Sequence, residues 1–116
     1  MVLGASDKAD RYSNMAVRML KSTGYHVIPV HPRLKEVEDL PAVNELGQIH
    51  ETVHTLTLYV GPQRSLVLMD EIVALRPGRV IFNPGTECDE LESRLRESGI
   101  QTVKGCTLVM LRSGRF

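Results

Sequence analysis

The sequence predicts an α/β fold in which a parallel sheet carries helices on both faces, as three layers in a single domain. Short apolar runs with strand character alternate with stretches of helical periodicity, and short turns containing Gly and Pro separate them. No internal repeat or low-complexity linker divides the 116 residues. Strands joined by helices pair in parallel, because each helix returns the chain to the same edge of the sheet. We therefore expect residues 1–116 to form one domain.

The first half of the chain supplies two expected strands with a helix between them. Residues 1–3 form the first strand and residues 26–30 the second. Its Pro29 indicates either a missing ladder hydrogen bond at that position or a position near the end of the strand. Ser13 is a good N-cap for the helix, and Gly24 ends it in the position of a left-handed C-cap.

The middle of the chain is less regular and differs in charge from what precedes it. One interpretation of residues 39–47 is a short helix. Residues 1–35 carry six basic groups against two acidic ones, whereas residues 36–51 carry five acidic groups and no Lys or Arg. The excess positive charge therefore lies on the first strand, the first helix and the turns that follow them.

The second half of the chain continues the alternation. Its strands are expected over residues 53–60, 79–82 and 100–103, and its helices over residues 65–75 and 86–99. Thr86 with Asp89 resembles a capping box at the start of the second of these helices, although Asp replaces the usual Glu. The apolar run over residues 108–111 is either a strand or a terminal helical turn. Together these elements predict a Rossmann-like domain.

Composition excludes several classes of protein. An apolar fraction of 42% and a charged fraction of 24% are typical of a soluble globular domain. No apolar run approaches the roughly 18 residues of a membrane span, and no signal peptide precedes the first strand, so we expect a cytoplasmic protein without a membrane partner. Cys88 and Cys106 do not form a C-x-x-C pair, which suits a reducing compartment. Zero net charge gives no support for broad binding to nucleic acid.

The turn after the first strand has the composition of a phosphate-binding loop. Gly4 permits close approach of a ligand, Ser6 supplies a hydroxyl, and Arg11 can pair with phosphate through two parallel hydrogen bonds. We expect unpaired backbone N–H groups here, with the positive end of the helix dipole behind them. The chain lacks the glycines of the G-x-G-x-x-G fingerprint and the P-loop motif, so the turn alone does not identify the ligand.

The turns at the carboxyl edge of the sheet narrow the choice of ligand, because open parallel sheets bind ligands there. Four of the five turns contain Gly, which permits close approach of an extended ligand. After the second strand comes His31-Pro32-Arg33, where an NAD-dependent dehydrogenase has an Asp or Glu that accepts hydrogen bonds from ribose. Arginine instead suits a phosphate on the adenosine ribose, as in NADP or in coenzyme A (CoA).

Four motifs occur along the chain in the order found in the small, stand-alone CoA-binding domain proteins. They are Gly4-Ala5-Ser6 with Arg11-Tyr12-Ser13-Asn14, Gly24-Tyr25 with Val30-His31-Pro32-Arg33, Asn83-Pro84-Gly85-Thr86, and Cys106-Thr107-Leu108-Val109-Met110. These proteins are similar to the N-terminal domain of the succinyl-CoA synthetase alpha subunit. The resemblance covers nearly the whole chain and implies a Rossmann-type fold that binds CoA.

The resemblance also implies which residues contact the cofactor. The CoA pyrophosphate is expected near Gly4, Ala5, Ser6 and Arg11. Further contacts are expected at Ser13, Asn14, Pro32, Arg33, Val60, Gly61, Pro62, Asn83, Pro84 and Gly85. The phosphorylated histidine of the synthetase lies in a separate domain that this chain lacks, so the resemblance implies binding and not the ligase reaction.

Two further groups of residues invite a catalytic or metal-binding interpretation. His50, Glu51 and His54 match the letters of the zinc motif H-E-x-x-H, but the motif needs a helix and this stretch leads into a β-branched, strand-like run. We therefore expect no metal site. Cys106 is either a small buried hydrophobe or a thiol near the pantetheine arm, where it can form a mixed disulfide with CoA.

Two functions of different classes remain from the sequence. The first is a non-catalytic module that binds CoA or an acyl-CoA, and the second is an NAD(P)-dependent oxidoreductase, or another enzyme, on a short Rossmann domain. At 116 residues there is no separate substrate domain, which favours the first. No side chain is singled out as catalytic.

Overall fold

A computed structural model describes residues 1–116 and has a five-stranded parallel sheet at its centre. The strand order is β2-β1-β5-β6-β7, and every neighbouring pair is parallel. The strands are β1 (Val2–Leu3), β2 (Pro29–Val30), β5 (Thr55–Leu58), β6 (Arg79–Phe82) and β7 (Gln101–Lys104). The expected parallel sheet is therefore confirmed, with its edge strand β2 only two residues long.

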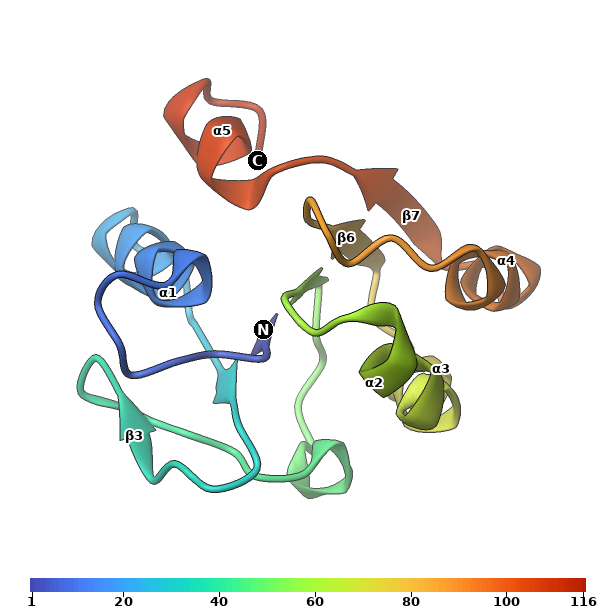
Figure 1. The fold of residues 1–116 in the computed structure, drawn as a ribbon, viewed down its shortest axis with the longest axis horizontal. Helices are drawn as coiled ribbons and strands as arrows, with labels where there is room; N and C mark the ends of the chain where they lie inside the picture. The colour runs from blue at the N-terminus through green and yellow to red at the C-terminus, as the bar shows by residue number, and fades with distance from the viewer.

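Helices cover both faces of this sheet (Figure 1). On one face lie α1 (Tyr12–Ser22) and α5 (Thr107–Arg112), which contact each other. On the other lie α2 (Pro62–Val67), α3 (Met69–Leu75) and α4 (Asp89–Glu97). The three-layer, Rossmann-like fold predicted from the sequence is confirmed. None of the helices combines the length and the apolar character needed to cross a membrane.

Each face of the sheet packs its own apolar cluster. Side chains alternate along a strand, so in β1 the Val2 side chain packs with the α1 layer while Leu3 packs with the α3–α4 layer. The larger cluster contains Leu56, Phe82 and Leu95, each no more than 1% exposed. Fully burying a side chain of this size stabilises the fold by about 1.5–3 kcal/mol relative to exposure.

Helix α1 differs from expectation at its start and agrees at its end. It begins at Tyr12, and Arg11 rather than Ser13 is the N-cap, without a side-chain capping hydrogen bond. At the other end Gly24 has a φ of 96°, and its N–H and that of Tyr25 donate to carbonyls of the last helical turn. This is the left-handed C-cap that the glycine predicts.

The short helix expected over residues 39–47 is wrong. The segment forms a hairpin of β3 (Glu36–Val37) and β4 (Leu40–Pro41), followed by the 3-10 turn η1 (Leu46–Gln48). Glu38 and Asp39 at its tip have φ values of 51° and 65°, as a type I′ turn requires. Val37 is buried against the α1 layer. Side chains alternate between the two faces of a strand, so the hairpin can bury this apolar side chain and leave its neighbours exposed.

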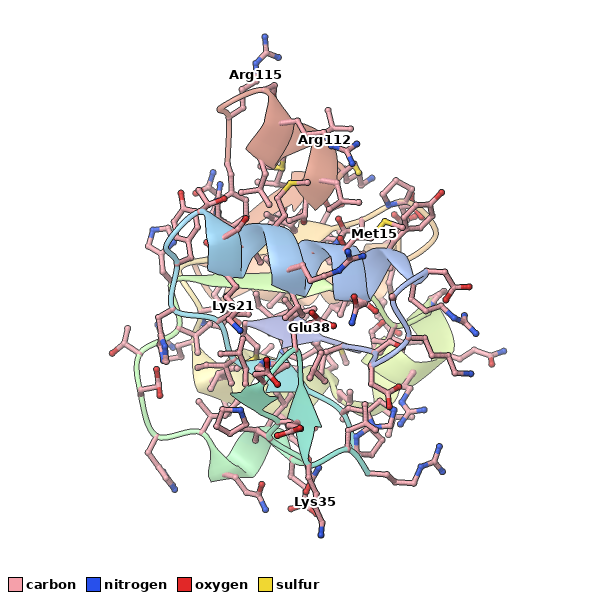
Figure 2. All side chains as sticks on the ribbon, turned by 90° about the vertical axis from the view of Figure 1, so that its left-hand side faces the viewer. Met15, Lys21, Lys35, Glu38, Arg112 and Arg115 are labelled. Carbon is pink, nitrogen blue, oxygen red and sulfur yellow. The ribbon has the colours of Figure 1, made fainter.

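The β3–β4 hairpin contacts α1 on the face of the molecule that Figure 2 shows. Lys21 and Glu38 lie there between the helix and the two short strands. Lys21 Nζ donates to the Glu38 carbonyl at 2.8 Å. The positive φ at the hairpin tip is thus held by a contact from an element distant in sequence.

Helix and strand limits in the second half also depart from the sequence prediction. The helix expected from Ser65 begins at Pro62, whose missing N–H needs no partner at a first helical position, and it breaks at Leu68 into α2 and α3. The expected capping box is wrong, since α4 begins at Asp89 and the Thr86 hydroxyl donates to the Asn83 carbonyl.

The ends of the strands are the remaining differences. The expected strand over residues 53–60 is shortened to Thr55–Leu58, and the last strand is shifted by one residue to Gln101–Lys104. Of the two alternatives for residues 108–111, the helical one holds, because this run lies in α5.

Candidate functional site

The sheet has a topological switch point beside β1. The chain passes from β1 to β2 on one side and then to β5 on the other, so the loops after β1 and β5 lead to helices on opposite faces of the sheet. A cavity of about 700 Å³ opens between these loops at the carboxyl edge of the sheet. Its walls come from the turns after β1, β2 and β5, from residues 44–47, and from α2 and α3. Ligands of open α/β sheets bind at such a point.

Four of the expected site residues line this cavity: Gly4, Pro32, Arg33 and Val60. Gly4 has a φ of 92°, and a Cβ added to it would lie 2.8 Å from Cγ1 of Val60. The turns after β1 and β5 are therefore in direct contact, and only glycine fits at this position.

The other expected residues lie along the same edge but outside this cavity. They are Ala5, Ser6, Arg11, Ser13, Asn14, Gly61, Pro62, Asn83, Pro84, Gly85 and Cys106. The topology brings all of them to one edge because each follows a parallel strand or begins the next helix.

The backbone of the expected phosphate loop forms more hydrogen bonds within the protein than the sequence predicts. The N–H groups of Gly4 and Ala5 both donate to the Val30 carbonyl at 3.1 Å, so the expectation that they are unpaired is wrong. No acceptor is found in the protein for the N–H groups of Ser6, Asp7, Ala9 and Asp10 further along the loop, nor for those of Tyr12, Ser13 and Asn14 in the first turn of α1. This turn has no side-chain cap, and it follows directly on the loop.

A buried asparagine holds the loop in place. Asn14 Nδ2 donates to the Ser6 carbonyl at 2.9 Å and to the Glu38 carboxylate at 3.2 Å, and its Oδ1 accepts from Arg18 Nε at 2.8 Å. Arg18 also donates to the Ala9 carbonyl. These contacts join the loop, α1 and the β3–β4 hairpin, and they explain why α1 starts at Tyr12.

The turn after β2 is built around His31. Its Nδ1 accepts the N–H groups of Arg33 at 3.0 Å and Leu34 at 3.2 Å, so the neutral ring carries its proton on Nε2. Asn44 Nδ2 donates to the carbonyls of His31 and Leu34, each at 2.8 Å. Burial lowers the pKa of His31 below 6.5, and the positive charges of Arg33 and Arg64 lower it further.

At the other end of the edge, the residues after β6 bond to one another. Asn83 is 2% exposed; its Nδ2 donates to Thr57 Oγ1 at 2.7 Å and to the Leu58 carbonyl at 2.9 Å. Its Oδ1 accepts the Thr107 N–H at 2.9 Å, and the hydroxyls of Thr57 and Thr107 are 2.7 Å apart. This network ties β5, β6 and the start of α5 together.

Gly85 and Cys106 flank this network. Gly85 has a φ of 89°, and its N–H donates to Glu87 Oε1 at 2.8 Å. Cys106 is half-buried at the N-cap of α5, near Tyr59. Burial raises the pKa of Tyr59 to about 12, with Thr107 and Thr57 as hydrogen-bonding neighbours that oppose the shift.

Arg64 and Asn44 are among the residues of the cavity that sequence reasoning missed. Arg64 lies in the first turn of α2, but a helix start at Ser65 leaves it in a loop. Extending that helix back to Pro62, a favoured first position, would have found it. Asn44 had no comparable signal, because its partners are 10 and 13 residues away in the chain.

His50, Glu51 and His54, which match the letters H-E-x-x-H, lie on irregular backbone before β5. The zinc motif needs a helix at this place, and the sequence predicts none. His26 Nε2 lies 2.7 Å from Glu51 Oε1, and both line a second cavity of about 390 Å³ at the amino edge of the sheet. No group of three or more His, Cys, Asp or Glu side chains is arranged to hold a metal ion.

Comparison with known proteins identifies relatives over the whole of this architecture. The profile of a family described as "CoA binding domain" matches residues 1–112. The uncharacterized Bacillus subtilis protein YneT is 33% identical over 98 residues, which cover 84% of this chain and 73% of that protein.

Two solved structures are also similar over almost the full length. One, described only as an uncharacterized protein, is 48% identical, with a TM-score of 0.94, and the match covers 99% of this chain and 94% of that one. The other, from Thermus thermophilus, is 33% identical, with a TM-score of 0.91, and the match covers 99% of this chain and 87% of that one.

Proposed function

This chain belongs to the CoA-binding domain family, and from that premise we propose that residues 1–116 act as one module that binds CoA or an acyl-CoA without a reaction of its own. The observation that carries the proposal is the cavity of about 700 Å³ at the switch point, bordered by an arginine where a dehydrogenase has a carboxylate. Cytoplasmic location and the absence of nucleic-acid and membrane partners belong to the same proposal.

The free donors along the edge support one orientation of the ligand. The CoA pyrophosphate would lie against the loop of Gly4, Ala5 and Ser6, near Arg11 and the uncapped first turn of α1. Each charge-assisted hydrogen bond from such a donor contributes about 1.5–3 kcal/mol. The adenosine would then enter the cavity, beside Pro32, Arg33 and Val60.

The pantetheine arm would run along the carboxyl edge away from the cavity. The strand order takes it past the ends of β5 and β6, where Gly61, Pro62, Asn83, Pro84 and Gly85 follow. Its thiol would approach Cys106, which is half-buried at the end of that path. The alternative ligands NAD and NADP would place a nicotinamide riboside along this part of the edge, and they carry no thiol that could reach Cys106.

Thermal unfolding with and without ligand tests the proposal. CoA at a hundredfold excess over its Kd should stabilise the protein by about 2.7 kcal/mol, because it binds only the folded chain. NAD and NADP at the same concentration serve as matched controls, and isothermal titration gives the Kd directly. Stabilisation by NAD with none by CoA would show that the module is a dinucleotide-binding domain instead.

A further inference from the structure

Two arginines line the cavity at the switch point without a partner in the protein. Arg33 comes from the turn after β2, and Arg64 from α2, which follows β5. They therefore enter the cavity from the two strands that flank β1. Neither guanidinium forms an ion pair or donates a hydrogen bond, whereas those of Arg18, Arg79, Arg94 and Arg96 do.

Both arginines act on the same imidazole. The positive charges of Arg33 and Arg64 each lower the pKa of His31, after burial, and Asp7 opposes them. An effect of both charges on one ring requires both guanidinium groups to lie within its electrostatic reach. Arg33 and Arg64 line the same cavity as His31, although they lie 31 residues apart along the chain.

The charges around this region fit a phosphorylated nucleoside. A guanidinium offers a planar pair of N–H donors that matches two phosphate oxygens, so two such groups suit the dianion of a phosphate monoester. Glu45 and Glu71 also line the cavity, and neither pairs with an arginine. Their carboxylates can accept hydrogen bonds from the one hydroxyl that remains on such a phosphorylated ribose and from the exocyclic amine of an adenine.

We propose that Arg64 is a specificity-determining residue that, together with Arg33, binds the 3′-phosphate on the adenosine of CoA; the inference rests on the proposed function. The site then separates CoA from ligands that keep the adenosine and the pyrophosphate but lack this phosphate. Dephospho-CoA, which differs from CoA only there, is the matched ligand.

Calorimetric titration of wild type and three variants tests the inference. Arg64→Ala should weaken CoA binding about tenfold or more, because charge-assisted hydrogen bonds are lost, and should change dephospho-CoA binding less than about twofold. Arg64→Lys keeps the charge without the planar fork and should recover part of the loss. Arg33→Ala should behave like Arg64→Ala, and the double variant should lose less than the product of the two effects, because they share one phosphate.

Arg112→Ala is the control: this exposed arginine of α5 (Figure 2) is not among the residues that line the cavity, so its loss should leave both affinities unchanged. Equal losses for CoA and dephospho-CoA in Arg64→Ala would overturn the inference while the proposed function stands. If wild type binds no CoA, adenosine 3′,5′-bisphosphate is titrated next. Binding that Arg64→Ala weakens would then support the arginine site alone, and no binding would overturn both proposals.

A second measurement needs no ligand. The proton resonances of His31, followed by NMR against pH, report the charge near the ring. Arg64→Ala should raise the pKa of His31 toward 6.5, because one of the positive charges that lower it is removed. An unchanged pKa would show that Arg64 does not face this region of the cavity.

Discussion

The two halves of the carboxyl edge of the sheet differ in what their polar side chains do. The half around β2, β1 and β5, which we call the hollow half, borders the cavity. The side chains of Arg11, Arg33 and Arg64 form no hydrogen bond or ion pair in the protein there. In the half around β6 and β7, which we call the filled half, the side chain of Asn83 forms hydrogen bonds to β5 and α5. Both halves present polar residues directly after a strand. The free donors are therefore the candidates for binding the phosphates of a ligand, whereas the bonded Asn83 stabilises the fold.

The largest effect should come from removing the amide of the filled half. Asn83→Ala leaves the Leu58 carbonyl and the Thr107 N–H buried without a partner, and three hydrogen bonds are lost. We expect a loss of about 3–4 kcal/mol in the free energy of unfolding, from about 1 kcal/mol per bond plus the unpaired groups. Urea denaturation of the variant measures it.

The matched change in the hollow half is Asn44→Ala, which removes two hydrogen bonds at an exposed turn. It should lower stability by about 1 kcal/mol or less. Its CoA affinity should fall more than that of Asn83→Ala, because the turn of His31 and Arg33 loosens. The reverse order of the two affinity losses would mean that contacts in the filled half, and not the adenosine contacts in the cavity, dominate the affinity.

The next largest effect is a difference in stability loss between alanine substitutions at two glycines that have nearly the same φ. Gly4 and Gly85 have φ values of 92° and 89°, but only Gly4 is crowded, with 2.8 Å from its added Cβ to Val60. Gly85→Ala should cost about 1 kcal/mol from strain, and Gly4→Ala about 3 kcal/mol from strain plus contact. Thermal unfolding of both variants compares them, and equal losses would show that the turns after β1 and β5 are not in contact in solution.

A third comparison concerns two arginines of α1 and its N-cap: Arg11, the N-cap, whose side chain forms no hydrogen bond, and Arg18, in the helix, whose side chain forms two. Arg11→Ala should weaken CoA binding about ten- to a hundredfold and leave the stability of the free protein unchanged, because its exposed side chain forms no hydrogen bond or ion pair in the protein. Arg18→Ala should instead lower stability by about 1–3 kcal/mol, since it loses hydrogen bonds to Asn14 and Ala9. Loss of stability in Arg11→Ala with an unchanged Kd would assign Arg11 to the fold.

The smallest effect is the pH dependence that His31 imparts. Its pKa is lower in the folded chain than its ordinary value of 6.5, so the unfolded chain takes up the proton first as the pH falls. The contribution of His31 to stability is therefore complete above pH 6.5 and is lost as the pH falls toward the folded pKa. Denaturation of wild type and His31→Asn between pH 5 and pH 8 isolates it, because Asn keeps an acceptor and does not titrate. Parallel curves would show that His31 has the same pKa in both states.

The elements were predictable from the sequence where one local rule decided them. Alternation of strands and helices gave the parallel sheet, and Gly24 gave the end of α1, because these signals depend on neighbouring residues alone. The hairpin of β3 and β4 was missed because its turn uses Glu38 and Asp39 instead of Asn or Gly. Its stability depends on burial of Val37 and on Lys21, which are visible only after the chain has folded.

For the candidate site, the sequence by itself determined the residue types and their edge, since turns after parallel strands always meet at one side of the sheet. Only the tertiary structure decided which of them are free. The N–H groups of Gly4 and Ala5 donate to the Val30 carbonyl, and the side-chain amide of Asn83 hydrogen-bonds to Thr57 and Thr107. Arg64 lies in the cavity without a hydrogen-bonding partner in the protein. The reason is that a hydrogen-bonding group is available to a ligand only when no part of the folded chain already satisfies it.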